Sequence, residues 1–173
     1  MRKKCELLGL GLSCCISFVG CAGYRLGPSN GEVAGQKAVA VGWFVNKTEE
    51  PRLGDALNRS LRKRFQQDAT WRLSTHGGAD IVVQGVLTRF ERQPLSFQPN
   101  DVVSTRDYLA RLTAHVEAIE TQSGRVVLNR DFVGHTPITK STDPASAERQ
   151  ALPLIADDLA VRIVSALVDG PWP

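Results

Sequence analysis

The sequence predicts an α+β fold: a two-layer sandwich in which two helices pack on one face of a mostly antiparallel sheet of four to five strands. First, residues 106–121 alternate apolar and polar side chains, which is typical of an antiparallel strand with one buried face. Second, residues 53–65 and 152–167 repeat apolar side chains at helical spacing. Third, the order strand, helix, several strands, helix favours helices packed on one face of a sheet.

The first predicted elements are a strand over residues 37–45, an apolar and β-rich run, and a helix that ends near Asp68. Thr48 or Glu50 is the expected N-cap of this helix, and Pro51 fits its first turn. The buried face is formed by apolar residues four positions apart: Leu53, Leu57, Leu61 and Phe65. Four basic residues fill the other face, which we expect to be solvated, with contact to an anionic surface as the alternative: Arg59, Arg62, Lys63 and Arg64.

The middle of the chain is predicted to form strands. A short strand covers residues 71–74, and three longer ones are expected at 79–92, 106–121 and 125–133. Gln122-Ser123-Gly124 makes a tight turn, so the last two strands form a hairpin. Residues 93–105 are polar and contain two prolines, and we expect a mobile loop there.

The last predicted helix is capped by Asp143-Pro144 and runs to about Val168. Its apolar face consists of Leu152, Ile155, Ala156, Leu159, Ile163 and Leu167. Asp157 and Asp158 lie on its polar face, where they are most simply solvated charges. Pro153 removes one helical hydrogen bond at a cost of about 3 kcal/mol, which predicts a kink or break around residues 149–152.

The N-terminus has the pattern of an export signal. A basic start, Met1-Arg2-Lys3-Lys4, precedes an apolar run from Leu7 to Gly20, which is too short to span a membrane comfortably. Phe18-Val19-Gly20-Cys21 resembles a bacterial lipobox, although that pattern prefers leucine where Phe18 stands. We therefore predict a lipoprotein signal peptide over residues 1–20, a lipidated tether over 21–35 and a single domain over 36–173.

Cys21 is the predicted lipidation site, and the lipid that it carries is the only cofactor-like group expected. Two other cysteines, Cys14 and Cys15, are weaker candidates because they would leave an apolar stub on the mature chain. Two or three acyl chains anchor a protein stably, whereas one chain gives marginal binding. An aspartate directly after the lipidated cysteine would resemble the retention signal of inner-membrane lipoproteins. This chain has Ala22 at that position, so the outer membrane is the expected location.

Removal of the signal peptide changes the cysteine count and the net charge of the mature chain. Three of the four cysteines leave with it, so the mature domain has no disulfide, no thiolate metal site and no cysteine nucleophile. The signal also holds three basic residues and one acidic residue, which leaves 18 basic against 17 acidic, a balance of +1. The high isoelectric point therefore gives no support for binding to nucleic acid.

No catalytic pattern emerges from the residues. His76, His115 and His135 lie far apart and form no metal-binding pair, and a G-x-S-x-G elbow and a phosphate-binding loop are both missing. We therefore predict that the protein is not an enzyme and holds no metal.

Three arginines are the candidate ligand-binding residues. Arg89 and Arg92 end one predicted strand and Arg106 opens the next, so an antiparallel pairing brings all three to the same end of the sheet. Arginine binds phosphate through two parallel hydrogen bonds, so this cluster could bind a ligand that carries phosphate groups. The alternative is cross-strand pairing with Glu91 and Asp107.

Several motifs together resemble the LptE family of lipopolysaccharide-assembly lipoproteins. They are Cys21-Ala22-Gly23-Tyr24-Arg25-Leu26, Asn46-x-Thr48, Leu57 with Leu61, Ala79-Asp80-Ile81-Val82, Arg106-x-Tyr108, and the final helix from Glu148 to Ile163-Val164. The resemblance implies a periplasm-facing outer-membrane lipoprotein that sits as a plug in the large β-barrel LptD, assists its assembly and binds lipopolysaccharide. On that basis Arg89, Arg92 and Arg106 are the candidate ligands for lipid A phosphates.

A second resemblance stays open. Val39-Ala40-Val41, followed by Phe44, Asn46 and Thr48, is also similar to the opening strand of curli-secretion and peptidoglycan-synthase-activator lipoproteins. Those proteins share a compact α/β fold but serve a secretion pore or a cell-wall synthase.

Overall fold

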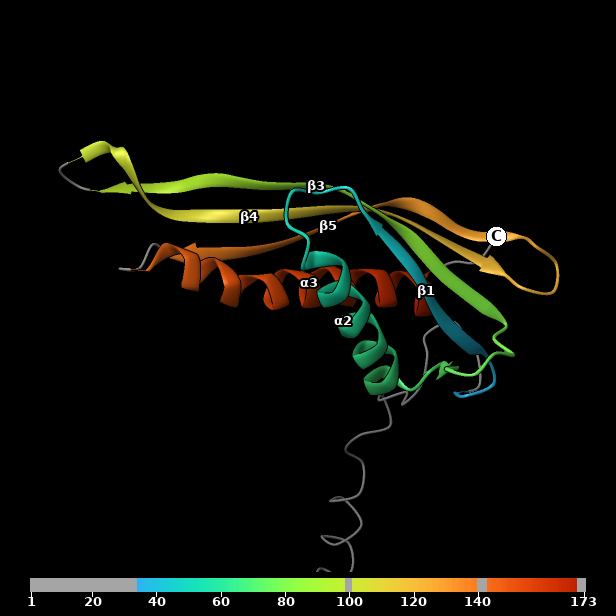
Figure 1. The fold of residues 1–173 in the computed structure, drawn as a ribbon. Coiled ribbons are helices and arrows are strands. Elements are labelled where there is room, and N and C mark those ends of the chain that lie inside the picture. The colour runs from blue at the N-terminus through green and yellow to red at the C-terminus, as the bar shows by residue number, and fades with distance from the viewer. Residues whose placement is uncertain (1–33, 99–100, 140–142, 171–173) are drawn as a thin grey trace, which may run out of the picture.

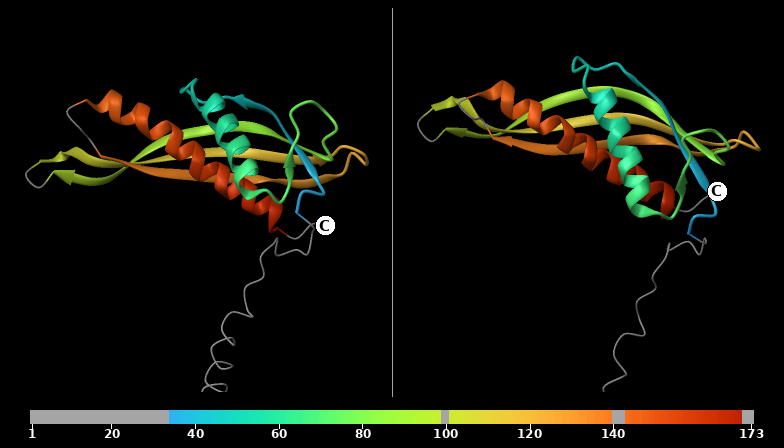
Figure 2. Two further views of the ribbon diagram at one scale, coloured as in Figure 1. Left: turned by 90° about the horizontal axis from the view of Figure 1, so that it is seen from below. Right: turned by 60° about the horizontal axis from the view of Figure 1, so that its bottom comes forward.

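The computed structural model describes residues 34–98, 101–139 and 143–170, with side chains except at 96–98, 101–106 and 144. In this part of the chain, five strands form one curled sheet and two helices cover one face of it (Figures 1 and 2). The elements in chain order are β1 (Ala38–Asn46), α2 (Leu53–Asp68), β2 (Arg72–Leu73), β3 (Ile81–Gln98), β4 (Asp101–Glu120), β5 (Val126–Thr139) and α3 (Pro144–Val168). The predicted α+β class is confirmed.

The sheet is mixed, so the prediction of a mostly antiparallel sheet is confirmed only in part. Its strand order is β2-β1-β3-β4-β5, and β1 runs parallel to both of its neighbours. Only β3, β4 and β5 form an antiparallel meander. The parallel pairs arise because α2 carries the chain back across the sheet before β2 and β3 begin, and such a crossover returns the chain in the same direction.

The core lies between the sheet and the two helices. Every apolar residue predicted to form the inner face of α2 is buried, as are those of α3. On β4 the even-numbered residues from Ala110 to Ala118 are fully buried, which confirms the predicted alternation. Phe65 at the end of α2 stacks on Trp71 with 6.3 Å between the ring centroids, which fixes the turn into β2.

The start of α2 differs from the prediction of Thr48 or Glu50 as its cap. Arg52 is the N-cap and contributes no side-chain hydrogen bond. Asn46 orders the preceding loop instead: its Nδ2 donates to Glu50 O at 2.8 Å, and its Oδ1 accepts from Thr48 N at 3.0 Å. At α3 the predicted cap is confirmed, because the Asp143 carboxylate accepts from Ser146 N at 3.2 Å.

The expected mobile loop over residues 93–105 is wrong. β3 continues to Gln98 and β4 begins at Asp101, so the two strands form one long hairpin (Figure 1). The register shifts after Pro94 and again on both sides of Phe97, and such irregularities accommodate a proline inside a strand. β5 likewise runs beyond Val133 to Thr139, since Pro137 sits in an edge strand.

The break predicted near Pro153 is also wrong, because α3 is continuous from Pro144 to Val168. The proline leaves the carbonyl of Arg149 without its helical donor. Both residues are exposed, so water replaces that bond at little cost. Neither of the two described helices is long and apolar enough to cross a membrane.

Candidate functional site

The structure separates the predicted phosphate-binding arginines. Cys21, with the predicted signal peptide and most of the tether, lies outside the described residues, as does the Arg106 side chain. Arg89 and Arg92 lie three positions apart on β3, and side chains alternate between the two faces of a strand. Arg92 shares a face with the partly buried Phe90 and binds Glu148 on α3, with 2.9 Å between Nε and Oε1. Arg89 therefore points to the opposite face.

Arg89 is the less constrained of the two described arginines. Its side chain is 68% exposed, and its Nη1 lies 3.5 Å from Oε1 of Glu91 on the same strand. An exposed pair at this distance contributes little to stability. The contact with Glu91 lies within β3 and is not the cross-strand pairing that we considered from the sequence, and it leaves Arg89 open to an anionic ligand.

The face of the sheet that carries no helix is a second candidate surface. On β4 it presents the odd-numbered residues, whereas the even-numbered ones are buried beneath the helices. One row across this uncovered sheet face joins Val45, Val86, His115 and Asp131 in register. The surface therefore changes from apolar on β1 to charged on β4 and β5.

Trp43 is the most exposed large apolar residue on this face, with 78% of its surface accessible, and Val45 beside it is 44% exposed. The register between β1 and β3 shifts between Val41 and Phe44, so Phe44 turns into the core while Trp43 turns outward. The sequence predicted an apolar strand here and did not show which of its side chains would be exposed. The signal that was missed is Gly42, which interrupts the alternation immediately before the tryptophan.

Histidine–carboxylate pairs occur on the surface but do not form a catalytic arrangement. His115 Nδ1 lies 2.7 Å from Asp131 Oδ1, and His135 Nδ1 lies 3.6 Å from Asp158 Oδ2. No serine or threonine hydroxyl bonds to either histidine within the described ranges. The same residues contain no group of three or more potential metal ligands.

Asp157 and Asp158 are not the solvated charges that we expected. Asp157 joins the two helices, since Arg64 on α2 donates to it through Nε at 3.2 Å and Nη2 at 2.5 Å. Asp158 accepts from Arg162 Nε at 3.0 Å and from the backbone N–H of His135 at 2.9 Å. Partial burial acts to raise the pKa of Asp158, but the hydrogen bond from Arg162 and the one from His135 N–H outweigh it and leave the pKa below its ordinary value.

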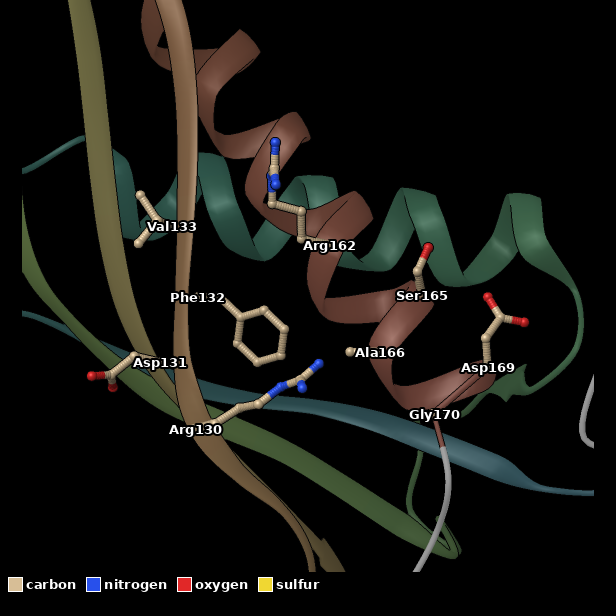
Figure 3. A pocket seen from close by; sticks show the side chains of 9 residues that line it. All are labelled: Arg130, Asp131, Phe132, Val133, Arg162, Ser165, Ala166, Asp169 and Gly170. Carbon is tan, nitrogen blue, oxygen red and sulfur yellow. The ribbon is translucent and has the colours of Figure 1, made fainter.

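A groove of about 640 Å³ lies between β5 and the C-terminal part of α3 (Figure 3). Phe132 and Ala166 form its apolar centre, and Arg130 and Arg162 stand at its two ends. The side chain of Asp131 points away from it, toward the uncovered sheet face. The sequence showed no sign of this groove, because its two sides, residues 130–133 and 162–170, lie about 30 positions apart in the chain and their spacing depends on how α3 packs.

Several solved structures are similar to this chain in fold. A comparison with curated proteins gave no match. Protein XCC0632 from Xanthomonas campestris is 16% identical with a TM-score of 0.58, covering 83% of this chain and 91% of that one. A minor lipoprotein from Acinetobacter baumannii is 18% identical with a TM-score of 0.56, covering 79% and 96%. Rare lipoprotein B from Shewanella oneidensis is 12% identical with a TM-score of 0.51, covering 75% and 92%.

At these identities the three structures establish a shared fold and no more. The family comparison is more specific, because the model for LptE, described as lipopolysaccharide-assembly, matches residues 36–167. That range contains both helices almost entirely and all five described strands. The family is one of non-enzymatic lipoproteins. The chain therefore belongs to the LptE lipopolysaccharide-assembly family.

Proposed function

We propose that the mature protein is a periplasm-facing outer-membrane lipoprotein that associates with an LptD-like β-barrel. There it assists assembly of the barrel and the insertion of lipopolysaccharide into the outer membrane. The observation that carries this proposal is the family match over residues 36–167. The lipid on Cys21 would hold the domain at the membrane without spanning it.

The uncovered sheet face is the surface that we assign to the barrel wall. Trp43 and Val45 expose apolar surface to water on this face. Exposed apolar surface of this kind is typical of a site where another molecule binds. A tryptophan side chain buries about 150–250 Å² on contact, and burial is worth roughly 25 cal/mol per Å². Aromatic residues of this kind often dominate the binding energy of an interface. Trp43 is therefore the expected anchor.

A pull-down from solubilised outer membranes tests this assignment. We expect stoichiometric recovery of a large β-barrel with the wild-type protein and a marked loss with Trp43→Ala. Leu154→Ala is the matched control, because Leu154 is a 60% exposed apolar residue on α3, away from the uncovered sheet face. Equal recovery with both variants would remove Trp43 from the interface.

The same pull-down separates the two functional hypotheses. Recovery of a penicillin-binding protein, or of a homo-oligomeric ring without a barrel, would favour the peptidoglycan-synthase-activator or curli-secretion type of lipoprotein. Recovery of a barrel at one copy per copy of this protein would favour lipopolysaccharide assembly.

For the phosphates of lipopolysaccharide we keep Arg89, Arg92 and Arg106 as candidates, and because Arg89 and Arg92 face opposite sides of β3, they would contact separate phosphate groups. Arg89 is the more accessible of the two described arginines, whereas Arg92 would have to break its ion pair with Glu148 before it could bind a phosphate. Replacing all three arginines with alanine should weaken lipopolysaccharide binding. A charge-matched control removes three exposed cations from α2 and its N-cap: Arg52, Arg59 and Lys63. Unchanged binding by the first variant, or equal loss in both, would remove the assignment.

A further inference from the structure

Most of the outer edge of β1 is closed by other parts of the chain. β2 pairs with its first residues, Ala38 and Val39. Farther along, Arg62 Nη2 on α2 donates to Val41 O and Asn58 Nδ2 donates to Gly42 O, both at 3.3 Å. Such capping prevents a free edge from pairing with another chain.

The other edge of the sheet, on β5, is closed only near its C-terminal end. The N–H of His135 donates to Asp158 on α3 at 2.9 Å, so the backbone of this residue points away from β4. Pro137, two positions later, has no N–H to offer. These two features protect the C-terminal half of β5.

The N-terminal half of β5 has no such protection. Backbone groups in a strand alternate in direction, and the register with β4 is regular here, so Asn129, Asp131 and Val133 point the same way as His135. All three are exposed, and in the described part of the chain no hydrogen bond occupies their outward N–H and C=O groups. They form an open edge of strand length, which we call the free β5 edge.

The groove described above runs alongside this edge. α3 touches β5 closely at Gly134, where an added Cβ would lie 2.7 Å from Leu159 Cβ. Beyond that contact the helix diverges and the groove opens between Phe132 and Ala166 (Figure 3). An exposed strand edge beside a helix is the arrangement in which extended peptides bind by adding a strand.

The charges of the groove indicate what kind of peptide fits. Arg130 lies 4.7 Å above the Phe132 ring, and among the described residues no carboxylate lies within ion-pair distance of it. Arg162 stands at the other end of the groove, held by Asp158. Asp169 at the C-terminal end of α3 is the acidic residue on the helix side. The part of the groove nearest the free β5 edge is therefore basic around an apolar centre.

We propose that an extended acidic segment of a partner protein adds to the free β5 edge as a further strand and places a carboxylate side chain beside Arg130. An apolar side chain two positions away contacts Ala166 and the small part of Phe132 that remains exposed, because alternate residues of the added strand face the groove. The carboxylate gains a charge-assisted hydrogen bond to a guanidinium that is already oriented by the aromatic ring beneath it. This inference goes beyond the proposed function and does not depend on which protein supplies the segment.

Two labelled peptides test the proposal by fluorescence anisotropy with the lipidated full-length mature protein in detergent. Each has about nine residues of alternating threonine and valine, and one groove-facing valine is replaced by aspartate or by lysine. We expect the aspartate peptide to bind about tenfold more tightly than the lysine peptide, and Arg130→Gln to abolish this difference. Equal affinity for both peptides, or no binding of either at about 1 mM, would overturn the proposal.

A backbone variant tests the strand pairing itself. Asp131→Pro removes an N–H that points away from β4, so the edge strand tolerates it, yet an added strand loses a partner. We expect it to weaken the aspartate peptide about tenfold, whereas Asp131→Ala, which removes only the contact with His115, retains binding. Wild-type affinity in Asp131→Pro would contradict the pairing. A dimer of the wild-type protein that Asp131→Pro converts to a monomer would show a second copy as the occupant instead.

Discussion

Gly134 is the position where a single methyl group should do most damage to the packing of α3. A Cβ at this residue of β5 would lie 2.7 Å from Leu159 Cβ and 2.9 Å from Ile155 O. Ordinary carbon–carbon contact needs about 3.5–4.0 Å, so Gly134→Ala requires the helix to move by about 1 Å. Overpacking of this kind typically costs about 1–3 kcal/mol, a large part of the stability of a single domain.

Gly54→Ala is the matched control for this prediction. Gly54 lies in the first turn of α2, where an added Cβ would meet Asn46 Cβ at an ordinary 3.6 Å. Because alanine favours the helix over glycine, this variant should be neutral or more stable by up to about 1 kcal/mol. Urea denaturation with an unchanged m-value measures both free energies of unfolding. Equal midpoints for the two variants would refute the close contact between α3 and β5.

Three further predictions concern polar contacts. A double-mutant cycle on Arg64 and Asp157 should give a coupling of about 0.5 kcal/mol, because both side chains are roughly one-third exposed, and additive effects would contradict the bridge between the helices. Since the folded pKa of Asp158 lies below its ordinary 3.8, its contribution is complete above that pH and is lost as the pH falls further. The gap in unfolding free energy between wild type and Asp158→Asn should therefore shrink on acidification, and a gap that widens in acid would contradict this sign. Asn46→Ala should lower the thermal midpoint by a few degrees, through loss of about 1 kcal/mol of loop hydrogen bonds, whereas an unchanged midpoint would show the loop to be ordered by other contacts.

The helices and the regular strands could be predicted because local sequence patterns determine them. Leucine or phenylalanine stands at every fourth position from Leu53 to Phe65. Such spacing places these side chains on one side of a helix, and it does not fit the alternation of a strand. The alternation from Tyr108 to Ala118 similarly indicates one buried face of a strand, and the structure buries its apolar residues from Ala110 onward. Each of these patterns can be recognised within about a dozen consecutive residues.

Features that depend on distant parts of the chain could not be predicted in the same way. A Cβ at Gly85 would lie 2.3 Å from His115 O on β4 and 2.9 Å from Phe44 Cε1 on β1. The glycine in this predicted strand did not indicate which strands would lie beside it. Pro94 was interpreted as part of a loop, yet an irregular strand pairing tolerates it, and an edge strand likewise tolerates Pro137. The opposite directions of Arg89 and Arg92 follow from strand alternation, which we did not apply to these two residues although both lie inside the predicted strand.

Delivery of newly made lipopolysaccharide to the cell surface tests the proposed role most directly. Pulse-labelled lipopolysaccharide can be followed to the outer membrane while the protein is depleted and then restored from a plasmid. We predict that depletion leaves labelled lipopolysaccharide in the inner membrane and that the wild-type gene, but not one carrying Cys21→Ser with Trp43→Ala, restores its delivery. Normal delivery during depletion, with a defect in cell-wall synthesis or in secretion instead, would contradict a role in lipopolysaccharide assembly.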